Sequence, residues 1–213
     1  MMKVNHSSQV ETLQSTYHLK NPIGTPESVR VCINHIASDR CALAVSSTRG
    51  LAIADMDILK RSGEFKIMYK SSPNGAQSDP EVSQSIFIPG TSFIVFSSSD
   101  GTLTCKDYRN ESSDPTQIKF KSPCLSLCLI PSQESDTVLL ACGTQSSRIH
   151  IVKLRLGVTS ELSLVTTIPT VVKQNALSFG VNHISYDVST FSLYAGVSRI
   201  GVFKWLYCNT EGS

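Results

Sequence analysis

Charge, tryptophan and long apolar runs are all scarce in this sequence of 213 residues. Charged residues make up 17% of the chain, and 19 Lys+Arg against 17 Asp+Glu leave a net charge of only +2. So small a charge gives no electrostatic drive for non-specific binding to nucleic acid or to an anionic membrane. No apolar run approaches the roughly 20 residues that a membrane-spanning helix requires, so we expect no membrane insertion.

Sequence patterns typical of catalysis and metal binding are absent as well. The phosphate-binding patterns Gly-x-Gly-x-x-Gly and Gly-x-x-x-x-Gly-Lys-Ser/Thr do not occur, nor does the Gly-x-Ser-x-Gly turn of many hydrolases. The five histidines show no metal-ligand spacing such as His-x-x-x-His. Cys142 and His150 can be drawn as a nucleophile and its base, but nothing in the sequence indicates an activated thiolate. We therefore expect no enzyme, no cofactor and no metal site.

The cysteines do not form a recognisable framework. There are seven, an odd number, and no two stand in a Cys-x-x-Cys pair. Cys124 and Cys128 have a spacing that metal sites can use, but leucines alternate with them and no second pair follows. Residues 1–20 are polar and lack the apolar centre of a signal peptide. We therefore expect a cytoplasmic or nuclear protein, not a secreted one, whose cysteines are buried reduced thiols.

A strand–turn–strand unit, by contrast, occurs four times. The turn between the second and third extended segments of each unit is anchored at Gly50, Gly101, Ser147 and Ile200. These anchors are 51, 46 and 53 residues apart. Spacings of roughly 40–50 residues are typical of β-propeller repeats, in which each unit forms one blade.

The segments around these turns have the composition of β-strands. They are rich in Val, Ile, Leu, Phe and Thr and are bounded by Gly, Pro, Ser, Asp and Asn. The middle segments, such as Phe93–Phe96 and Val138–Ala141, are almost continuously apolar, which predicts strands covered on both faces. Candidate outer strands are Phe65–Tyr69, Thr116–Phe120 and Leu162–Ile168. No stretch sustains an apolar period of 3.6 residues, so we expect helices to be short at most.

We therefore predict an all-β fold of about four propeller blades, each with four antiparallel strands. The four units span about residues 28–70, 82–120, 124–168 and 180–207. Residues 1–27 are expected to be poorly structured or to add an outer strand, and residues 208–213 to form a tail. Another all-β array or a barrel is the alternative. Four blades make either an open arc or a compact ring. The sequence leaves open whether the chain is a fragment or isoform, and whether a partner closes the arc.

The second unit resembles a WD repeat. Its run from Ser98 to Asp107 matches the family pattern Ser-x-Asp-Gly-Thr-Ile-x-Leu-Trp-Asp, except that Lys106 replaces the tryptophan. Trp205 stands at that position in the fourth unit, without a following aspartate, and no unit has the family's Gly-His pair. The resemblance implies a WD-like propeller that acts as a non-catalytic protein–protein interaction scaffold. Its partners would be the other protein subunits of an intracellular assembly.

A shorter likeness covers a single unit. The segments Leu125–Leu129, Leu140–Gly143 and Arg148–Ile151 resemble one blade of the second subunit of Elongator, a family with two large propellers that scaffolds an enzyme modifying the tRNA wobble uridine. This chain is too short for two propellers. The likeness implies an alternative function as a scaffold subunit of an RNA-modifying complex, in which an arginine-lined face lies near RNA. Contact with nucleic acid would then come through the partner complex.

Arginine recurs at the turn that follows the middle strand. Three units carry it, as Arg49, Arg148 and Arg199, while the remaining unit carries Asp100 and Arg30 precedes the first inner strand. Because these turns emerge on one face of a propeller, we expect the five residues to form a partner-binding face. Guanidinium groups are well suited to carboxylates and phosphates. The alternative is that arginine is simply common in exposed turns.

Overall fold

The computed structural model describes residues 33–39, 41–48, 50–63, 66–71, 80–110, 112–132, 134–157, 160–170 and 179–206. The segments 1–27 and 208–213, for which the sequence predicts a poorly structured or added strand and a tail, lie outside the described residues. The described part contains fifteen strands and one helix. That helix, α1, has seven residues and falls far short of crossing a membrane.

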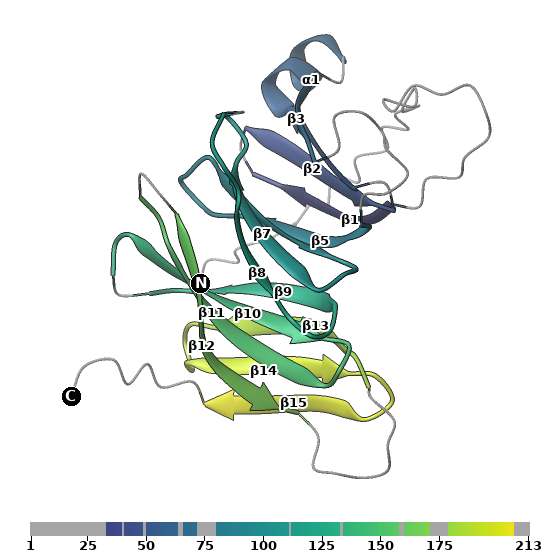
Figure 1. Cartoon of the computed structure of the whole chain (residues 1–213), viewed down its shortest axis with the longest axis vertical. Coiled ribbons are helices and arrows are strands. Elements are labelled where there is room, and N and C mark those ends of the chain that lie inside the picture. Colours follow the sequence, from purple (N-terminus) through teal and green to yellow (C-terminus); the bar gives the residue numbers. More distant parts are fainter. Residues whose placement is uncertain are drawn as a thin grey trace, which may run out of the picture.

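The strands form four antiparallel sheets that follow one another down the long axis of the molecule, from purple to yellow in Figure 1. Within each sheet the strands lie in sequence order. The first sheet contains β1 (Ile33–Ser38), β2 (Ala42–Ser47), β3 (Gly50–Asp55) and β4 (Ile67–Lys70). The second contains β5 (Val82–Phe87), β6 (Phe93–Ser98), β7 (Thr102–Asp107) and β8 (Thr116–Lys119). The third contains β9 (Cys124–Ile130), β10 (Thr137–Thr144), β11 (Arg148–Arg155) and β12 (Glu161–Pro169). The fourth contains β13 (Val181–Asp187), β14 (Ser192–Val197) and β15 (Gly201–Leu206).

The predicted all-β class and the succession of four antiparallel sheets are confirmed. One detail is wrong for the described residues, because the fourth sheet has three strands instead of four. The described part ends at Leu206, which is the last residue of β15. The inner strands β1, β5, β9 and β13 contact one another in succession, but β13 and β1 make no comparable contact among the described residues. The sheets therefore form an open, propeller-like arc.

Adjacent sheets pack face to face through apolar side chains, and each such contact is called a seam here. The face of a sheet toward the next sheet in the sequence is its leading face, and the opposite face is its trailing face. The first seam buries Ala44 and Ile53 against Ile94 and Phe96. The other two seams are built in the same way from the following apolar groups: Val95, Leu103, Leu140 and Val152 in the second, and Ala141, Ile151, Ile184 and Leu193 in the third.

One buried hydroxyl also bonds across each seam. The Ser46 and Ser85 hydroxyl groups lie 2.9 Å apart in the first seam. Ser97 Oγ donates to the carbonyl of Cys124 at 3.2 Å in the second, and Ser126 Oγ donates to the carbonyl of Val181 at 2.7 Å in the third. A buried hydroxyl without a partner is costly, so these bonds allow serine to sit within otherwise apolar contacts.

The sequence anchors fall in the same turn of all four sheets, the turn between the middle and third strands. Gly50, Gly101 and Ser147 adopt positive φ angles of 102°, 87° and 59°. In the fourth sheet the positive φ of 60° belongs to Arg199, one residue before the anchor Ile200. Glycine takes such angles without steric cost, which explains why two of the four anchors are glycine.

Helix α1 (Met56–Ser62) joins β3 to β4 and lies beside β3 at one end of the molecule (Figure 1). Asp55 starts it, because its carboxylate accepts hydrogen bonds from two backbone N–H groups of the first turn. Gly63 ends it in the left-handed conformation, with its N–H donating to the carbonyl of Leu59 at 2.9 Å. The helix contains no buried residue, so no apolar period marks it in the sequence.

Candidate functional site

The first and second sheets leave a cleft between β4 on one side and β7, β8 and the loop joining them on the other. Its central chamber has a volume of about 540 Å³ and shares Tyr69 and Pro115 with a chamber of about 290 Å³. On the other side it shares Ile67 and Met68 with a chamber of about 460 Å³. At the next seam the outer strands β8 and β12 contact each other, and the Thr116 hydroxyl donates to the Ser160 carbonyl at 2.7 Å.

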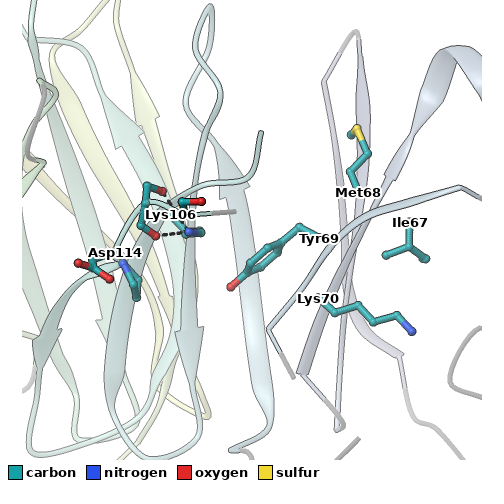
Figure 2. Close-up of a pocket in the computed structure, with 9 residues that line it drawn as sticks. Ile67, Met68, Tyr69, Lys70, Lys106 and Asp114 are labelled. Carbon is teal, nitrogen blue, oxygen red and sulfur yellow. Dashed lines mark hydrogen bonds between the residues drawn. The ribbon is translucent and has the colours of Figure 1, made fainter. Parts of the chain in front are cut away.

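Lys106 lies at the centre of this cleft (Figure 2). Its side chain is buried, with 4% of the residue exposed, and its ammonium donates to the backbone carbonyl of Ser113 and to the Ser113 hydroxyl, the latter at 3.0 Å. Tyr69 projects from β4 toward Lys106, whereas Ile67 and Lys70 project from the other side of the strand (Figure 2). Burial raises the pKa of Tyr69, so its hydroxyl stays protonated and available as a donor.

Tyr108 and Arg109 lie at one end of the cleft, where they line the 460 Å³ chamber with Asp55, Asp57 and Lys66. Only 1% of Tyr108 is exposed, and its hydroxyl makes no hydrogen bond of good geometry among the described residues, although it interacts with the neighbouring Arg109 guanidinium. The Arg109 guanidinium carbon lies 5.8 Å from the centre of the Tyr108 ring, within the range of a cation–π contact. This end therefore offers an exposed guanidinium as a donor and two carboxylates as acceptors, with the Tyr108 phenol buried behind them.

The opposite end of the cleft is lined by apolar side chains, among them Val82 and Phe96, together with short polar ones. Among the polar residues, Gln117 Nε2 donates to Thr104 Oγ1 at 3.2 Å, and Asp100 and Thr102 also line this end. Asp100 also bonds within its own turn, accepting from the N–H and the hydroxyl of Thr102 at 3.0 and 2.9 Å, and it pairs with Lys119 at 3.1 Å. Partial burial opposes ionisation of Asp100, but these donors outweigh it and lower its pKa.

Of the five residues for which the sequence predicts a binding face, the structure describes three. Arg30 and Arg49 lie outside the described residues. Asp100 and Arg199 occupy the same, middle position of the three-residue turn in the second and fourth sheets. Arg148 lies two positions later, as the exposed first residue of β11, where its N–H donates to Thr144 Oγ1 at 3.2 Å. Asp100 and Arg199 thus lie within corresponding turns, and Arg148 lies directly after the equivalent turn of the sheet between them.

Reversing the charge of Arg148 and Arg199 together tests this predicted face. Both side chains are exposed, so the change to glutamate should weaken capture of a cellular partner while leaving the melting temperature within about 2 °C. The matched control reverses Arg155, at the far end of β11, together with exposed Lys60 on α1. Partner capture from native cells, followed by mass spectrometry, measures the effect. Equal capture by both double variants contradicts a role for these arginines.

The structure places Cys142 and His150 opposite each other on β10 and β11. A hydrogen bond with Cys124 and, to a smaller extent, burial raise the pKa of Cys142 well above its ordinary value. The thiol is therefore a poor nucleophile. His150 stacks on Phe120, with ring centres 4.5 Å apart, and its Nδ1 lies 2.8 Å from Thr167 Oγ1. Burial lowers the pKa of His150, with a smaller contribution from nearby Arg148. Through these contacts, both side chains take part in the packing around the third sheet.

Sequence reasoning missed Met68, Tyr69, Tyr108 and Arg109, which line the cleft. None of them belongs to a repeat position or a known pattern, because the cleft arises from the divergence of two sheets. The one signal in the sequence is Lys106, a charged residue where the resemblance leads one to expect tryptophan. It lies on a strand that is otherwise buried, so a cation at this point indicates a local polar partner or a nearby opening.

Comparisons with known proteins identify the fold alone. No family model matches the sequence, and no curated protein matches it. Among solved structures, the computationally designed Ika4 protein aligns with a TM-score of 0.54 at 15% identity, over 85% of this chain and 94% of its own. Raptor from Chaetomium thermophilum aligns with a TM-score of 0.61 at 13% identity, over 85% of this chain and 16% of its own. The designed Ika8 protein aligns with a TM-score of 0.53 at 14% identity, over 82% of this chain and 45% of its own. The chain thus spans about half of Ika8 and a small part of Raptor, and it shares their arrangement of sheets.

Proposed function

We propose that this chain is a non-catalytic interaction scaffold, a WD-like propeller segment that holds a protein partner within a larger assembly. The observation that carries the proposal is the cleft between the first and second sheets, whose lining includes Tyr108, a residue with a buried hydroxyl that makes no well-formed hydrogen bond among the described residues. A buried hydroxyl without a well-formed hydrogen bond costs about 1–3 kcal/mol, so an occupant of the cleft that displaces the groups covering it and accepts its hydrogen bond recovers part of that amount.

An extended peptide of the partner fits this cleft chemically. β4 is the outermost strand of its sheet, and a peptide can add beside such a strand through its backbone. Its side chains would meet Met68 and Tyr69, which are partly buried and offer apolar surface. Its carbonyl groups would accept from Tyr108 and Arg109. Peptide recognition of this kind needs no catalytic group and is consistent with a scaffold.

Selection of binding peptides from a displayed random library tests the proposal. We expect selected peptides to lose affinity about 5-fold or more on Tyr108→Phe, which removes one hydroxyl and keeps the ring. The same substitution should change the free energy of unfolding little, because the hydroxyl makes no well-formed hydrogen bond with a described residue and its neighbour Arg109 is exposed to solvent. Fluorescence anisotropy and urea unfolding measure the two effects, and Tyr194→Phe on the fourth sheet is the matched control.

Two outcomes contradict this function. The first is a set of peptides that bind Tyr108→Phe and Tyr69→Ala as tightly as the unchanged chain, which places their site elsewhere. The second is retention of RNA alone, with an affinity that falls steeply as salt rises, which favours the RNA-modifying complex instead.

A further inference from the structure

The strand registers allow the four sheets to be compared position by position. Each inner strand carries an irregularity at the same place, and the residue after it pairs with the middle strand in the same way. These pairs are His35–Ser46, Gln84–Ser97, Ser126–Gly143 and His183–Gly196. Every other residue on the inner, middle and third strands can be assigned an equivalent by counting from these pairs.

The leading face of the fourth sheet is exposed where the other leading faces are buried. Opposite Ser46, Ser97 and Gly143, the third strands carry Leu51, Leu103 and Ile149, all of them buried in the seams. Opposite Gly196 the equivalent residue is Val202, which is 76% exposed. Val202 therefore occupies a seam position without a neighbouring sheet among the described residues.

The trailing face of the first sheet is likewise exposed where the other trailing faces are buried. Ser85, Leu127 and Ile184 are equivalent residues on the trailing sides of β5, β9 and β13, and all three are buried. Their equivalent on β1 is Ile36, which is 56% exposed. Within the described part, one leading face and one trailing face are thus uncovered. Together, two such faces make up a seam.

In the first and third seams, the residues at these two positions fit each other in size. In the first seam Ser46 meets Ser85, and their hydroxyl groups bond. In the third seam Gly143 meets Ile184, whose Cδ1 would lie only 2.8 Å from a Cβ atom on residue 143. The isoleucine therefore fills the space that the glycine leaves, and neither residue could be enlarged without strain.

The two uncovered faces carry the same matched pair. Gly196 is equivalent to Gly143, and Ile36 is equivalent to Ile184. A Cβ atom on Gly196 would meet only His183, at an ordinary 3.7 Å, so nothing described in the chain itself requires glycine there. Glycine lowers strand stability, which makes its use at an open strand position informative.

We infer that a second copy of this chain covers these faces: Ile36 of each copy packs on Gly196 of the other. The fourth sheet of each copy then meets the first sheet of its partner copy, and two such seams close a ring of eight sheets. Eight blades lie within the range of propellers, roughly four to eight. Contacts between unlike faces form a closed ring only when the rotation from one copy to the next brings the last face back to the first. Two arcs of four sheets related by a two-fold axis meet that condition.

The charged side chain on the leading face is compatible with this seam. Lys204 lies opposite Tyr194, and its ammonium is 5.5 Å from the centre of the Tyr194 ring. A cation held over an aromatic ring keeps part of its stabilisation when water is excluded. Half-buried Leu43 and Val45 of the first sheet supply further apolar surface opposite this face.

Sedimentation equilibrium of the full chain tests the inference. The 23.2 kDa chain should reversibly form a species of twice its mass. Gly196→Val should raise the dissociation constant of that species at least about 100-fold, because the ring contains the overpacked seam twice. Ile36→Glu should do the same by placing a charge in the seam. Both substitutions alter surface positions, so the melting temperature at a dilution where the chain is monomeric should be unchanged.

A double variant separates direct contact from a general surface effect. Ile36→Ala removes the side chain that the valine introduced by Gly196→Val would strike, so combining the two substitutions should restore at least about 10-fold of the lost affinity. A chain that is monomeric at every concentration overturns the inference, as do open polymers larger than two copies. Equal association of the single and double variants also overturns it. Peptide binding in the cleft involves the first two sheets and stays measurable in all these variants, so its outcome is independent.

Discussion

Substitution of Gly143 by valine is expected to lower the free energy of unfolding by about 3–5 kcal/mol. A Cβ atom at this position would lie 2.4 Å from Ser126 Oγ, 2.7 Å from Val181 Cγ1 and 2.8 Å from Ile184 Cδ1. All three atoms belong to the packed seam between the third and fourth sheets. Because Ser126 Oγ donates to the Val181 carbonyl, moving it aside also breaks a buried hydrogen bond.

Urea unfolding followed by circular dichroism measures this effect at a protein concentration where the chain is monomeric. Gly196→Val is the matched control, since it makes the same chemical change at the equivalent strand position, where a Cβ atom makes only ordinary contacts with His183. Valine favours strands, so the control should be neutral or slightly stabilising. Equal stability of the two variants would show that the third seam is looser than the packing around Gly143 indicates.

Gly101→Val is expected to cost about 3 kcal/mol or more, for a different reason. Gly101 has a φ of 87°, which valine adopts only with strain, and a Cβ atom would lie 2.6 Å from the backbone carbonyl oxygen of Phe120. That carbonyl cannot rotate away like a side chain. The Phe120 N–H donates to the carbonyl of Gly101 at 2.9 Å, so separating the two segments also disrupts the end of the β7–β8 pair.

Gly90→Val provides the comparison for this second substitution. Gly90 also has a positive φ, 75°, but a Cβ atom at this position would have no described atom within 4 Å. The Gly90→Val variant is therefore destabilised only by the conformational strain of a β-branched residue at positive φ. The difference in unfolding free energy between the two variants isolates the close approach of Phe120. A difference near zero contradicts the tight turn that the structure places at Gly101.

Much of the architecture was accessible from the sequence because strand composition and repeat spacing are local properties. The middle strand expected at Phe93–Phe96 is present as β6, and the outer strand expected at Thr116–Phe120 is present as β8. The turn anchors could be recognised because a tight turn needs a residue such as Gly101, whose requirement does not depend on distant parts of the chain.

The cleft could not be predicted in the same way. Tyr69 and Tyr108 line different chambers of the cleft, which exists only because the first two sheets diverge at their outer strands, and no spacing in the sequence encodes that divergence. Arg148 was expected within a turn, but the register places it at the start of β11. Helix α1 depends on the cap at Asp55 instead of an apolar face, so a search for periodicity overlooks it.

The matched residues of the seams also bear on how such a chain avoids misfolding. Four sheets with similar strand patterns could dock in the wrong order, and internal repeats are prone to such errors. If the fourth sheet docked on the first in place of the second, Ile184 would press against Ser46 and deprive its hydroxyl of the bond with Ser85. If the second sheet docked on the third, Ser85 would face Gly143 and leave a void. The Ser46–Ser85 and Gly143–Ile184 pairings are thus chemically distinct, so side-chain size and hydroxyl placement favour the correct partners in the first and third seams, in addition to chain connectivity.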